Sequence, residues 1–139
     1  MRIYYTEQWW LVDAWQTTKL DDRKGFNLAE LISFDIDGTL EVGDPPGCID
    51  MEMVRKAKEK GYIIGSCSDR TVTNQKRIWS EQGIEVSFTV VKHQLESVKE
   101  AFEADCYYHI GDTNIDKQYA DQAGFTFFLP EDSVPVFWD

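Results

Sequence analysis

The sequence lacks any uninterrupted apolar stretch near the ~20 residues that a membrane-spanning helix needs. Residues 1–16 also lack the apolar core of a signal peptide, because Glu7 and Asp13 interrupt them, so we expect them to belong to the mature protein. The three cysteines are widely spaced and form no C-x-x-C pair. Their pattern argues against a zinc site or a disulfide framework and favours a reducing cytoplasm.

Positive charge is also scarce. The 14 Lys and Arg residues are outnumbered by 25 Asp and Glu residues, which gives a net charge of −11. An acidic surface argues against broad contact with nucleic acid or with an anionic membrane, because both partners need a basic patch. It does not exclude a phosphorylated substrate, because a bound cation can reverse the local field. With 139 residues, of which 42% are hydrophobic, the chain is suited to one domain with a real core.

Strands and helices are expected to alternate from residue 31 onwards. Apolar runs predict strands over residues 31–36, 62–67, 85–91, 106–110 and 125–129. Helical periodicity and terminating glycines predict helices over residues 50–60, 71–82, 93–103 and 115–123. This alternation predicts an α/β protein with a three-layer α/β/α Rossmann-like fold and a mostly parallel sheet of about five strands.

Polar residues follow the apolar runs at the point where each predicted strand ends. In the order of the first four predicted strands, these residues are Asp35 and Asp37, Ser66 and Ser68, Lys92, and Gly111 and Asp112. Ligands of open α/β sheets bind at the carboxyl ends of the strands, so we expect these residues to converge at one edge of the sheet.

The acidic residues at this edge point to a cation. Asp35, Asp37, Asp112 and Asp116 cannot all stay ionised in one crevice without a positive partner. Oxygen ligands favour a hard ion, and Mg²⁺ is the expected one, assisted by Lys92. An extended strand sends side chains two residues apart to the same face, so Asp35 and Asp37 are expected side by side. One carboxylate could then attack phosphorus while the other handles the proton of the leaving group.

The order of these residues carries a family resemblance. Asp35-Ile-Asp37-Gly38-Thr39, then Ser68 after a strand, then Lys92, and then Gly111-Asp112-Thr-Asn-Ile-Asp116 resemble the four motifs of the haloacid dehalogenase superfamily. The resemblance covers residues 31–129, and it implies that residues 31–139 form the catalytic domain. It implies that Asp35 is the nucleophile that forms an aspartyl-phosphate. Asp37 would protonate the leaving oxygen and then activate the hydrolytic water.

The resemblance also implies a ligand set. Mg²⁺ would be held by a carboxylate oxygen of Asp35, the backbone carbonyl of Asp37 and Asp112, with Asp116 as a further ligand or a brace. Ser68 would hydrogen-bond the phosphoryl oxygens, and Lys92 would hold the nucleophile and the phosphate together. The full set expected around the phosphate is Gly38, Thr39, Ser68, Asp69, Arg70 and Lys92.

Several assignments have alternatives. Ser66 could take the place of Ser68. We favour Ser68, because Ser68-Asp69-Arg70 stands about where the family has Ser/Thr-Asn-Lys. Lys99 could take the place of Lys92. We favour Lys92, because Lys92 directly follows an apolar strand. Arg70 either selects an anionic substrate or faces solvent. His109, inside an apolar strand, is interpreted as a core histidine with satisfied hydrogen bonds.

The resemblance implies a capless phosphatase. Dehalogenases lack an acid at the position of Asp37, which points to phosphatase or phosphomutase chemistry. Residues 40–61 and 69–91 leave no room for a cap domain, which a mutase usually needs. We therefore expect a phosphohydrolase with an open crevice that acts on an unidentified phosphomonoester. The alternatives are a phosphotransferase or phosphomutase, and a catalytically silent module that binds a phosphorylated ligand. A response-regulator receiver has its acidic residues in a different order.

Residues 1–30 form an aromatic-rich extension outside the family pattern. Its first half holds Tyr4, Tyr5, Trp9, Trp10 and Trp15. These aromatic residues either pack on the flank of the domain or form a lid or a homo-oligomer interface. Residues 43–47 (GDPPG) are interpreted as a flap over the site.

Overall fold

The protein is built around a parallel sheet. The computed structural model describes residues 19–21 and 26–139, so the aromatic residues between Tyr4 and Trp15 lie outside it. Within the described chain, a five-stranded sheet has the order β5-β4-β3-β6-β7, and all of its neighbouring strands are parallel. The strands are β3 (Glu30–Phe34), β4 (Ile63–Ser68), β5 (Phe88–Val91), β6 (Cys106–Ile110) and β7 (Thr126–Phe128).

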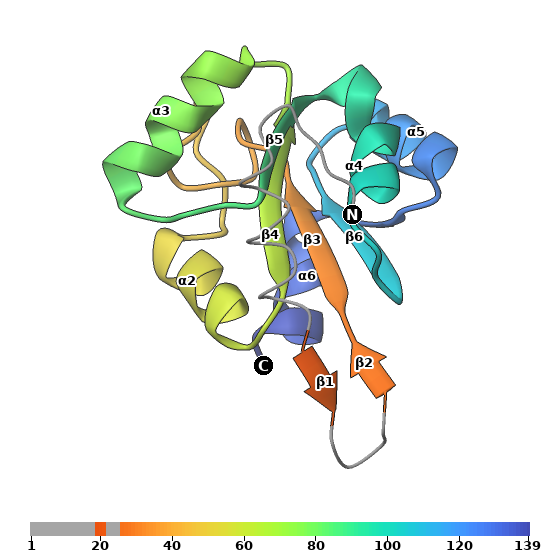
Figure 1. The fold of residues 1–139 in the computed structure, drawn as a ribbon. Coiled ribbons are helices and arrows are strands. Elements are labelled where there is room, and N and C mark those ends of the chain that lie inside the picture. The colour runs from red at the N-terminus through yellow and green to blue at the C-terminus, as the bar shows by residue number, and fades with distance from the viewer. Residues whose placement is uncertain (1–18, 22–25) are drawn as a thin grey trace.

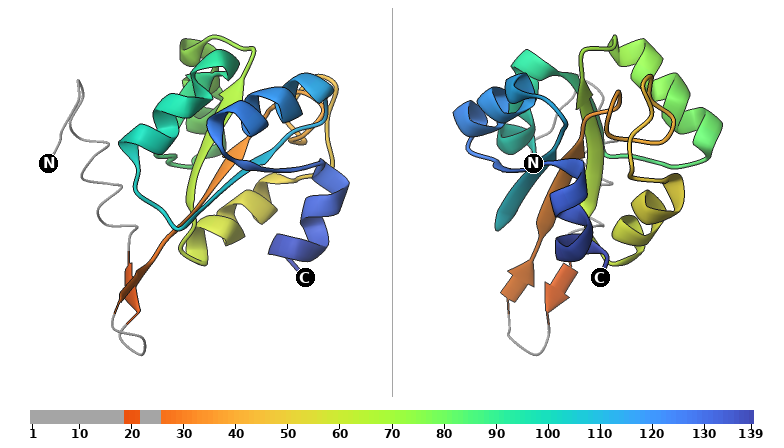
Figure 2. Two further views of the ribbon diagram at one scale, coloured as in Figure 1. Left: turned by 90° about the vertical axis from the view of Figure 1, so that its right-hand side faces the viewer. Right: turned by 180° about the vertical axis from the view of Figure 1, so that it is seen from behind.

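Helices cover both faces of this sheet (Figures 1 and 2). They are α2 (Met51–Glu59), α3 (Val72–Gln82), α4 (Leu95–Ala101), α5 (Asn114–Ala123) and α6 (Pro130–Phe137), with a short 3₁₀ helix, η1 (Lys92–Gln94), before α4. The apolar residues of α2, α3 and α6 belong to one core, and those of α4 and α5 belong to another. The predicted three-layer α/β/α Rossmann-like fold is confirmed.

The central strand β3 shows why the strands are continuous apolar runs. Ile32 and Phe34 lie in the core under α2, α3 and α6, whereas Leu31 lies in the core under α4 and α5. A strand of a parallel sheet that is covered on both faces needs apolar side chains at consecutive positions rather than at alternate ones.

Helix caps account for the agreement between predicted and observed boundaries. The side chains of Asp50, Thr71 and Thr113 each accept a hydrogen bond from a backbone N–H in the first turn of the following helix. Gly83 and Gly124 end α3 and α5 with left-handed backbone conformations (φ 68° and 79°), which glycine adopts at little cost.

Several boundaries differ from the prediction by one to three residues. β3 ends at Phe34, because the chain turns at residues 37–39 and does not stay extended through the second acid. β5 begins at Phe88, three residues later than predicted, and α4 begins only after η1. Two further elements were not predicted: helix α6, and a separate two-stranded antiparallel sheet of β1 (Lys19–Asp21) and β2 (Phe26–Leu28) at the amino end of β3.

A compact loop, residues 35–50, joins β3 to α2. It folds back on itself through a hydrogen bond from Gly38 N to the Pro45 carbonyl (2.6 Å) and a bridge between Leu40 and Ile49. Residues 69–71 join β4 to α3. Neither connection in the described chain holds a cap domain, as predicted. No helix among the described residues is both long enough and apolar enough to cross a membrane.

Helix α6 completes the core on its face of the sheet. The Phe137 side chain is buried, and its ring contacts the rings of Tyr62, Tyr108 and Phe128. We expect Phe137→Ala to lower the free energy of unfolding by about 3 kcal/mol, through lost burial and a cavity. The matched change Val136→Ala, at a position that is 54% exposed, is expected to cost within about 0.5 kcal/mol. Chemical denaturation of both variants would measure this, and equal losses would show that α6 contributes nothing to the core.

Candidate functional site

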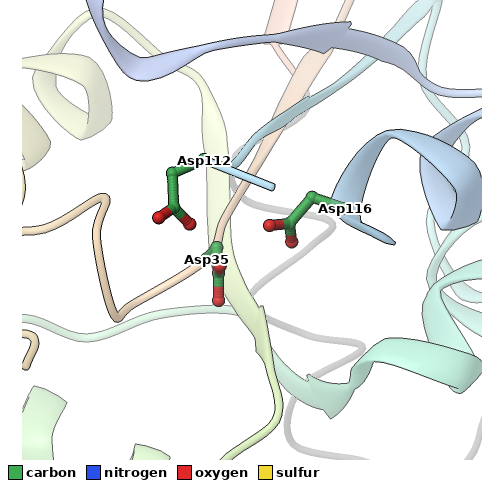
Figure 3. A group of neighbouring side chains, drawn as sticks. All are labelled: Asp35, Asp112 and Asp116. Carbon is green, nitrogen blue, oxygen red and sulfur yellow. The ribbon is translucent and has the colours of Figure 1, made fainter. Parts of the chain in front are cut away.

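Three carboxylates meet at the carboxyl edge of the sheet (Figure 3). Asp35 follows β3, Asp112 follows β6, and Asp116 lies in the first turn of α5. Each contributes one oxygen to a group whose members all lie within 4.8 Å of one another. Asp35 and Asp116 are buried and Asp112 is exposed. This acidic triad, Asp35, Asp112 and Asp116, could hold a metal ion with the third acid open to solvent.

Two glycines make room for the acidic triad. Gly38 has a φ of +76°, and a Cβ at this position would lie 1.9 Å from Oδ2 of Asp112. A Cβ on Gly111 would lie 2.4 Å from Cγ of Asp116. The glycine of the first motif therefore allows both the turn after β3 and the close approach of Asp112.

Lys92 is the cation within this group. Its Nζ lies 3.6 Å from Oδ2 of Asp35, 3.3 Å from Oδ1 of Asp116 and 3.5 Å from Oδ2 of Asp69. The lysine side chain is only 8% exposed, whereas that of Asp69 is 83% exposed. Lys99 instead lies over the Tyr107 ring on the outside of the domain. Lys92, and not Lys99, accompanies the acids.

The two buried acids beside Lys92 have pKa values that are shifted in opposite directions. Burial raises the pKa of Asp35 to about 8, and the charge of Asp116 adds to this effect, while Lys92 opposes it only in part. Burial also disfavours the charged form of Lys92, but Asp35, Asp116 and Asp69 outweigh it and leave the lysine pKa raised. Without a further cation, the Asp35 carboxyl group holds a proton near neutral pH.

Asp116 is held in its charged form by its neighbours. Burial alone would raise its pKa, but the hydrogen bond and electrostatic attraction of His109, the hydrogen bond from Thr113 and the charge of Lys92 hold the pKa well below its usual range. Oδ2 of Asp116 accepts hydrogen bonds from the backbone N–H (3.2 Å) and the hydroxyl (2.8 Å) of Thr113. Thr113 is the N-cap of α5, so the capping box that begins the helix also orients this acid.

Asp37 does not join the acidic triad through its side chain. Its carboxylate accepts hydrogen bonds from Arg70 Nη2 (2.7 Å) and from the backbone N–H of Asp44 (2.7 Å). Burial alone would raise its pKa, but these hydrogen bonds, together with the charges of Arg70 and Lys92, outweigh burial and lower the pKa below its usual value. Arg70, whose guanidinium also donates to Asn74 (2.8 Å), faces Asp37 rather than open solvent.

The two candidate serines have different surroundings. Ser66 is buried, donates to Oε1 of Gln75 (2.6 Å) and accepts from Nε1 of Trp79 (2.9 Å). Ser68 is the last residue of β4, and its hydroxyl accepts from the backbone N–H of Arg70 (3.0 Å). These surroundings favour Ser68 as the serine that faces a ligand, because the hydroxyl of Ser66 is already satisfied in the core.

Thr39 has a buried hydroxyl in the turn that follows β3. Its Oγ1 has no hydrogen-bond partner within the described part of the chain, although the residue is 0% exposed. Buried hydroxyls are normally hydrogen-bonded, so this oxygen is suited to a partner outside the protein chain.

The structure adds two contacts that sequence reasoning missed. His109, which was interpreted as a core residue, contacts Asp116. Arg70 contacts Asp37, from which it is separated by 33 positions in sequence. The first contact has a local signal in the sequence, because His109, near the end of β6, and Asp116, in the first turn of α5, lie only seven positions apart. The second contact has no local signal.

No protein-family model matches the chain, and no curated protein matches it in sequence. The function is therefore inferred from the side chains and their arrangement.

The raised pKa of Asp35 predicts a pH-dependent stability. Its pKa is about 8 in the folded chain, against an ordinary value of 3.8 for this side chain. The unfolded chain therefore releases this proton first, and the group lowers stability as pH rises from about 4 to about 8. We expect Asp35→Asn to stabilise the metal-free protein, by roughly 2 kcal/mol more at pH 8 than at pH 5. Urea unfolding at both pH values measures this, and an unchanged difference would contradict a raised Asp35 pKa.

Proposed function

We propose that this chain is a Mg²⁺-dependent phosphohydrolase of the haloacid dehalogenase type, which works through an aspartyl-phosphate on Asp35. The observation that carries the proposal is the acidic triad at the carboxyl edge of a parallel sheet, with the Lys92 ammonium beside it. The order of these residues along the chain, which resembles the four motifs of that superfamily, adds independent support.

The donor set fits Mg²⁺. Asp35 and Asp112 would hold the ion, together with the backbone carbonyl of Asp37, and all of these donors are oxygen atoms. Within residues 29–139 the Asp112 carboxylate makes no hydrogen bond or ion pair. Asp116 is engaged through both oxygens and is better suited to brace Lys92 than to bind the ion alone. When bound, Mg²⁺ supplies positive charge that offsets the phosphoryl oxygens and lets Asp35 ionise.

Asp35 is the proposed nucleophile. One of its carboxylate oxygens forms a bond to phosphorus while the bond from phosphorus to the ester oxygen breaks. Oδ1 of Asp35 accepts a hydrogen bond from the backbone N–H of Ile36 (2.8 Å), and Lys92 lies near Oδ2. These contacts fix the direction of the carboxylate, which limits the reorientation that attack requires.

Asp37 is the proposed acid and base. It would give a proton to the leaving oxygen, and then take one from the water that attacks phosphorus and releases phosphate from Asp35. Asp37 lies in the turn two residues after the nucleophile and is hydrogen-bonded to Arg70. Lys92, Ser68 and the Thr39 hydroxyl would hold the phosphoryl oxygens during both steps, because each can donate a hydrogen bond.

The connections of the fold favour hydrolysis over transfer to a second substrate. Residues 35–50 form a loop tied to itself, and residues 69–71 are a short link, so no cap domain among the described elements shields the acidic triad. Water therefore has access to the phospho-aspartate, and the expected substrate is a phosphomonoester that approaches an open crevice.

Phosphate release tests the reaction. With a panel of phosphomonoesters, including p-nitrophenyl phosphate and phosphopeptides, we expect release in Mg²⁺ and none in EDTA. Asp35→Asn is expected to reduce release by at least ~10³-fold, because it removes the nucleophile. Asp121→Asn, at an exposed position on α5, is the matched control and should keep full activity. Undiminished release by Asp35→Asn would contradict the proposed nucleophile.

The space beside Gly38 makes a separate prediction about the metal. Gly38→Ala places a methyl group against Asp112, so we expect Mg²⁺ affinity to fall by ~10-fold or more. Gly83→Ala is the matched control, because Gly83 also has a positive φ (68°) but a Cβ there meets nothing within 4 Å. Calorimetric titration of Mg²⁺ into both variants measures the difference. Equal affinities would show that Asp112 does not bind the ion.

A further inference from the structure

A buried chain of three polar side chains leads from the middle of the sheet to the acidic triad. Ser33 on β3 and His109 on β6 are register partners, and the Ser33 hydroxyl lies 2.9 Å from Nδ1 of His109. Nε2 of the same ring lies 3.1 Å from Oδ1 of Asp116. Ser33 and Asp116 are 0% exposed and His109 is 1% exposed. Each group therefore depends on its neighbours in this chain for hydrogen bonds that solvent does not provide.

The chemistry of the three groups gives the chain a direction. An ionised carboxylate only accepts hydrogen bonds, so the contact with Asp116 requires a proton on Nε2 of His109. In a neutral ring Nδ1 is then an acceptor, and the Ser33 hydroxyl can donate to it. With a neutral ring, donation runs from Ser33 to His109 and from His109 to Asp116, and each of the three groups has a hydrogen-bond partner.

Removing the imidazole would change the balance of donors on Asp116. Oδ2 is held by Thr113, while Oδ1 faces both His109 and Lys92. Without His109, the charged donor that remains beside Oδ1 is the Lys92 ammonium, 3.3 Å away. The carboxylate would then be drawn towards Lys92, and Lys92 would be drawn away from Asp35, 3.6 Å from its Nζ.

We infer that His109, with a proton on Nε2 facing Asp116 and with Ser33 at Nδ1, is a positioning residue that fixes the Asp116 carboxylate within the acidic triad and so sets the affinity of the site for Mg²⁺. This inference rests on the proposed function, in which Asp35 and Asp112 hold the ion beside Asp116. Hydrogen-bond partners of metal-site acids orient them, and loss of such a partner typically costs 10–100-fold in metal affinity.

The first test is Mg²⁺ titration by calorimetry on the full chain without substrate. We expect His109→Phe to bind Mg²⁺ at least ~10-fold more weakly than the wild type. His109→Gln should stay within about 3-fold of the wild type, because the Gln amide N–H₂ can reach Asp116 in place of Nε2. Ser33→Ala should weaken binding several-fold. Ile110→Val, a change in the neighbouring buried residue that faces the other core, is the control for lost packing and should bind normally.

A second measurement needs no metal and no variant that risks misfolding. Long-range ¹H–¹⁵N NMR of the wild type reports which ring nitrogen of His109 carries the proton. A proton on Nε2 is the expected result, and a ring protonated on Nδ1 alone would overturn the inference.

The outcomes separate this inference from the proposed function. Equal Mg²⁺ affinity in the wild type and in a folded His109→Phe or Ser33→Ala variant would overturn the inference and leave the proposed function intact. A wild type that binds no Mg²⁺ would overturn both. Mg²⁺ binding that is weakened by His109→Phe, in a chain that releases no phosphate, would contradict the proposed reaction and support the inference.

Discussion

The site depends on one ammonium group buried among carboxylates. Lys92 Nζ lies within 3.6 Å of Asp35, Asp69 and Asp116, and its side chain is only 8% exposed. At an effective dielectric of about 20, two like charges 4 Å apart repel by about 4 kcal/mol, so the acids require this cation. One ammonium is nevertheless insufficient: it leaves the pKa of Asp35 at about 8. Burial, together with the charge of Asp116, keeps this pKa high, and a divalent cation beside Asp35 would supply the positive charge that lets it ionise.

The sheet brings these groups together from distant parts of the sequence. β3 and β6 are adjacent and parallel, with Phe34 opposite Ile110, so the residues that follow them emerge side by side at one edge. Close approach then depends on the absence of side chains at Gly38 and Gly111. The geometry of the acidic triad is thus a consequence of strand register and of two glycines, and the helix cap of α5 fixes the orientation of its third member.

The sequence predicts the features that local patterns encode, and it misses those that depend on long-range contacts. Strand β6 is observed with the predicted bounds. Helix α3 lies between its N-cap, Thr71, and its C-cap, Gly83, within one residue of the predicted bounds. Helix α6 escaped prediction because Pro135 lies inside it and because its eight residues depend on tertiary contacts, such as those of the Phe137 ring. The ion pair between Arg70 and Asp37 was invisible for the same reason, since the residues come from different connections of the fold. The alternation of strands and helices was sufficient to predict the fold, and the order of the motifs was sufficient to predict the acidic triad. The hydrogen-bond partners of these acids could be identified only from the structure.

The side chains of Asp35 and Asp37 point to different partners, which explains how the chain can place two acids so close in sequence. Continued extension would have directed both carboxylates to one face. The turn at residues 37–39 instead sends Asp37 to Arg70, 2.7 Å away, while Asp35 stays beside Lys92. Each acid has its own cation, and their environments shift the two pKa values in opposite directions, up for Asp35 and down for Asp37. Pairs of acids whose pKa values are pushed apart are typical of sites in which two carboxylates have different tasks. In the metal-free chain these two directions are the reverse of what the proposed roles need, because a nucleophile must be ionised and a general acid must carry a proton. The proposed reaction therefore depends on a bound cation that lets Asp35 ionise.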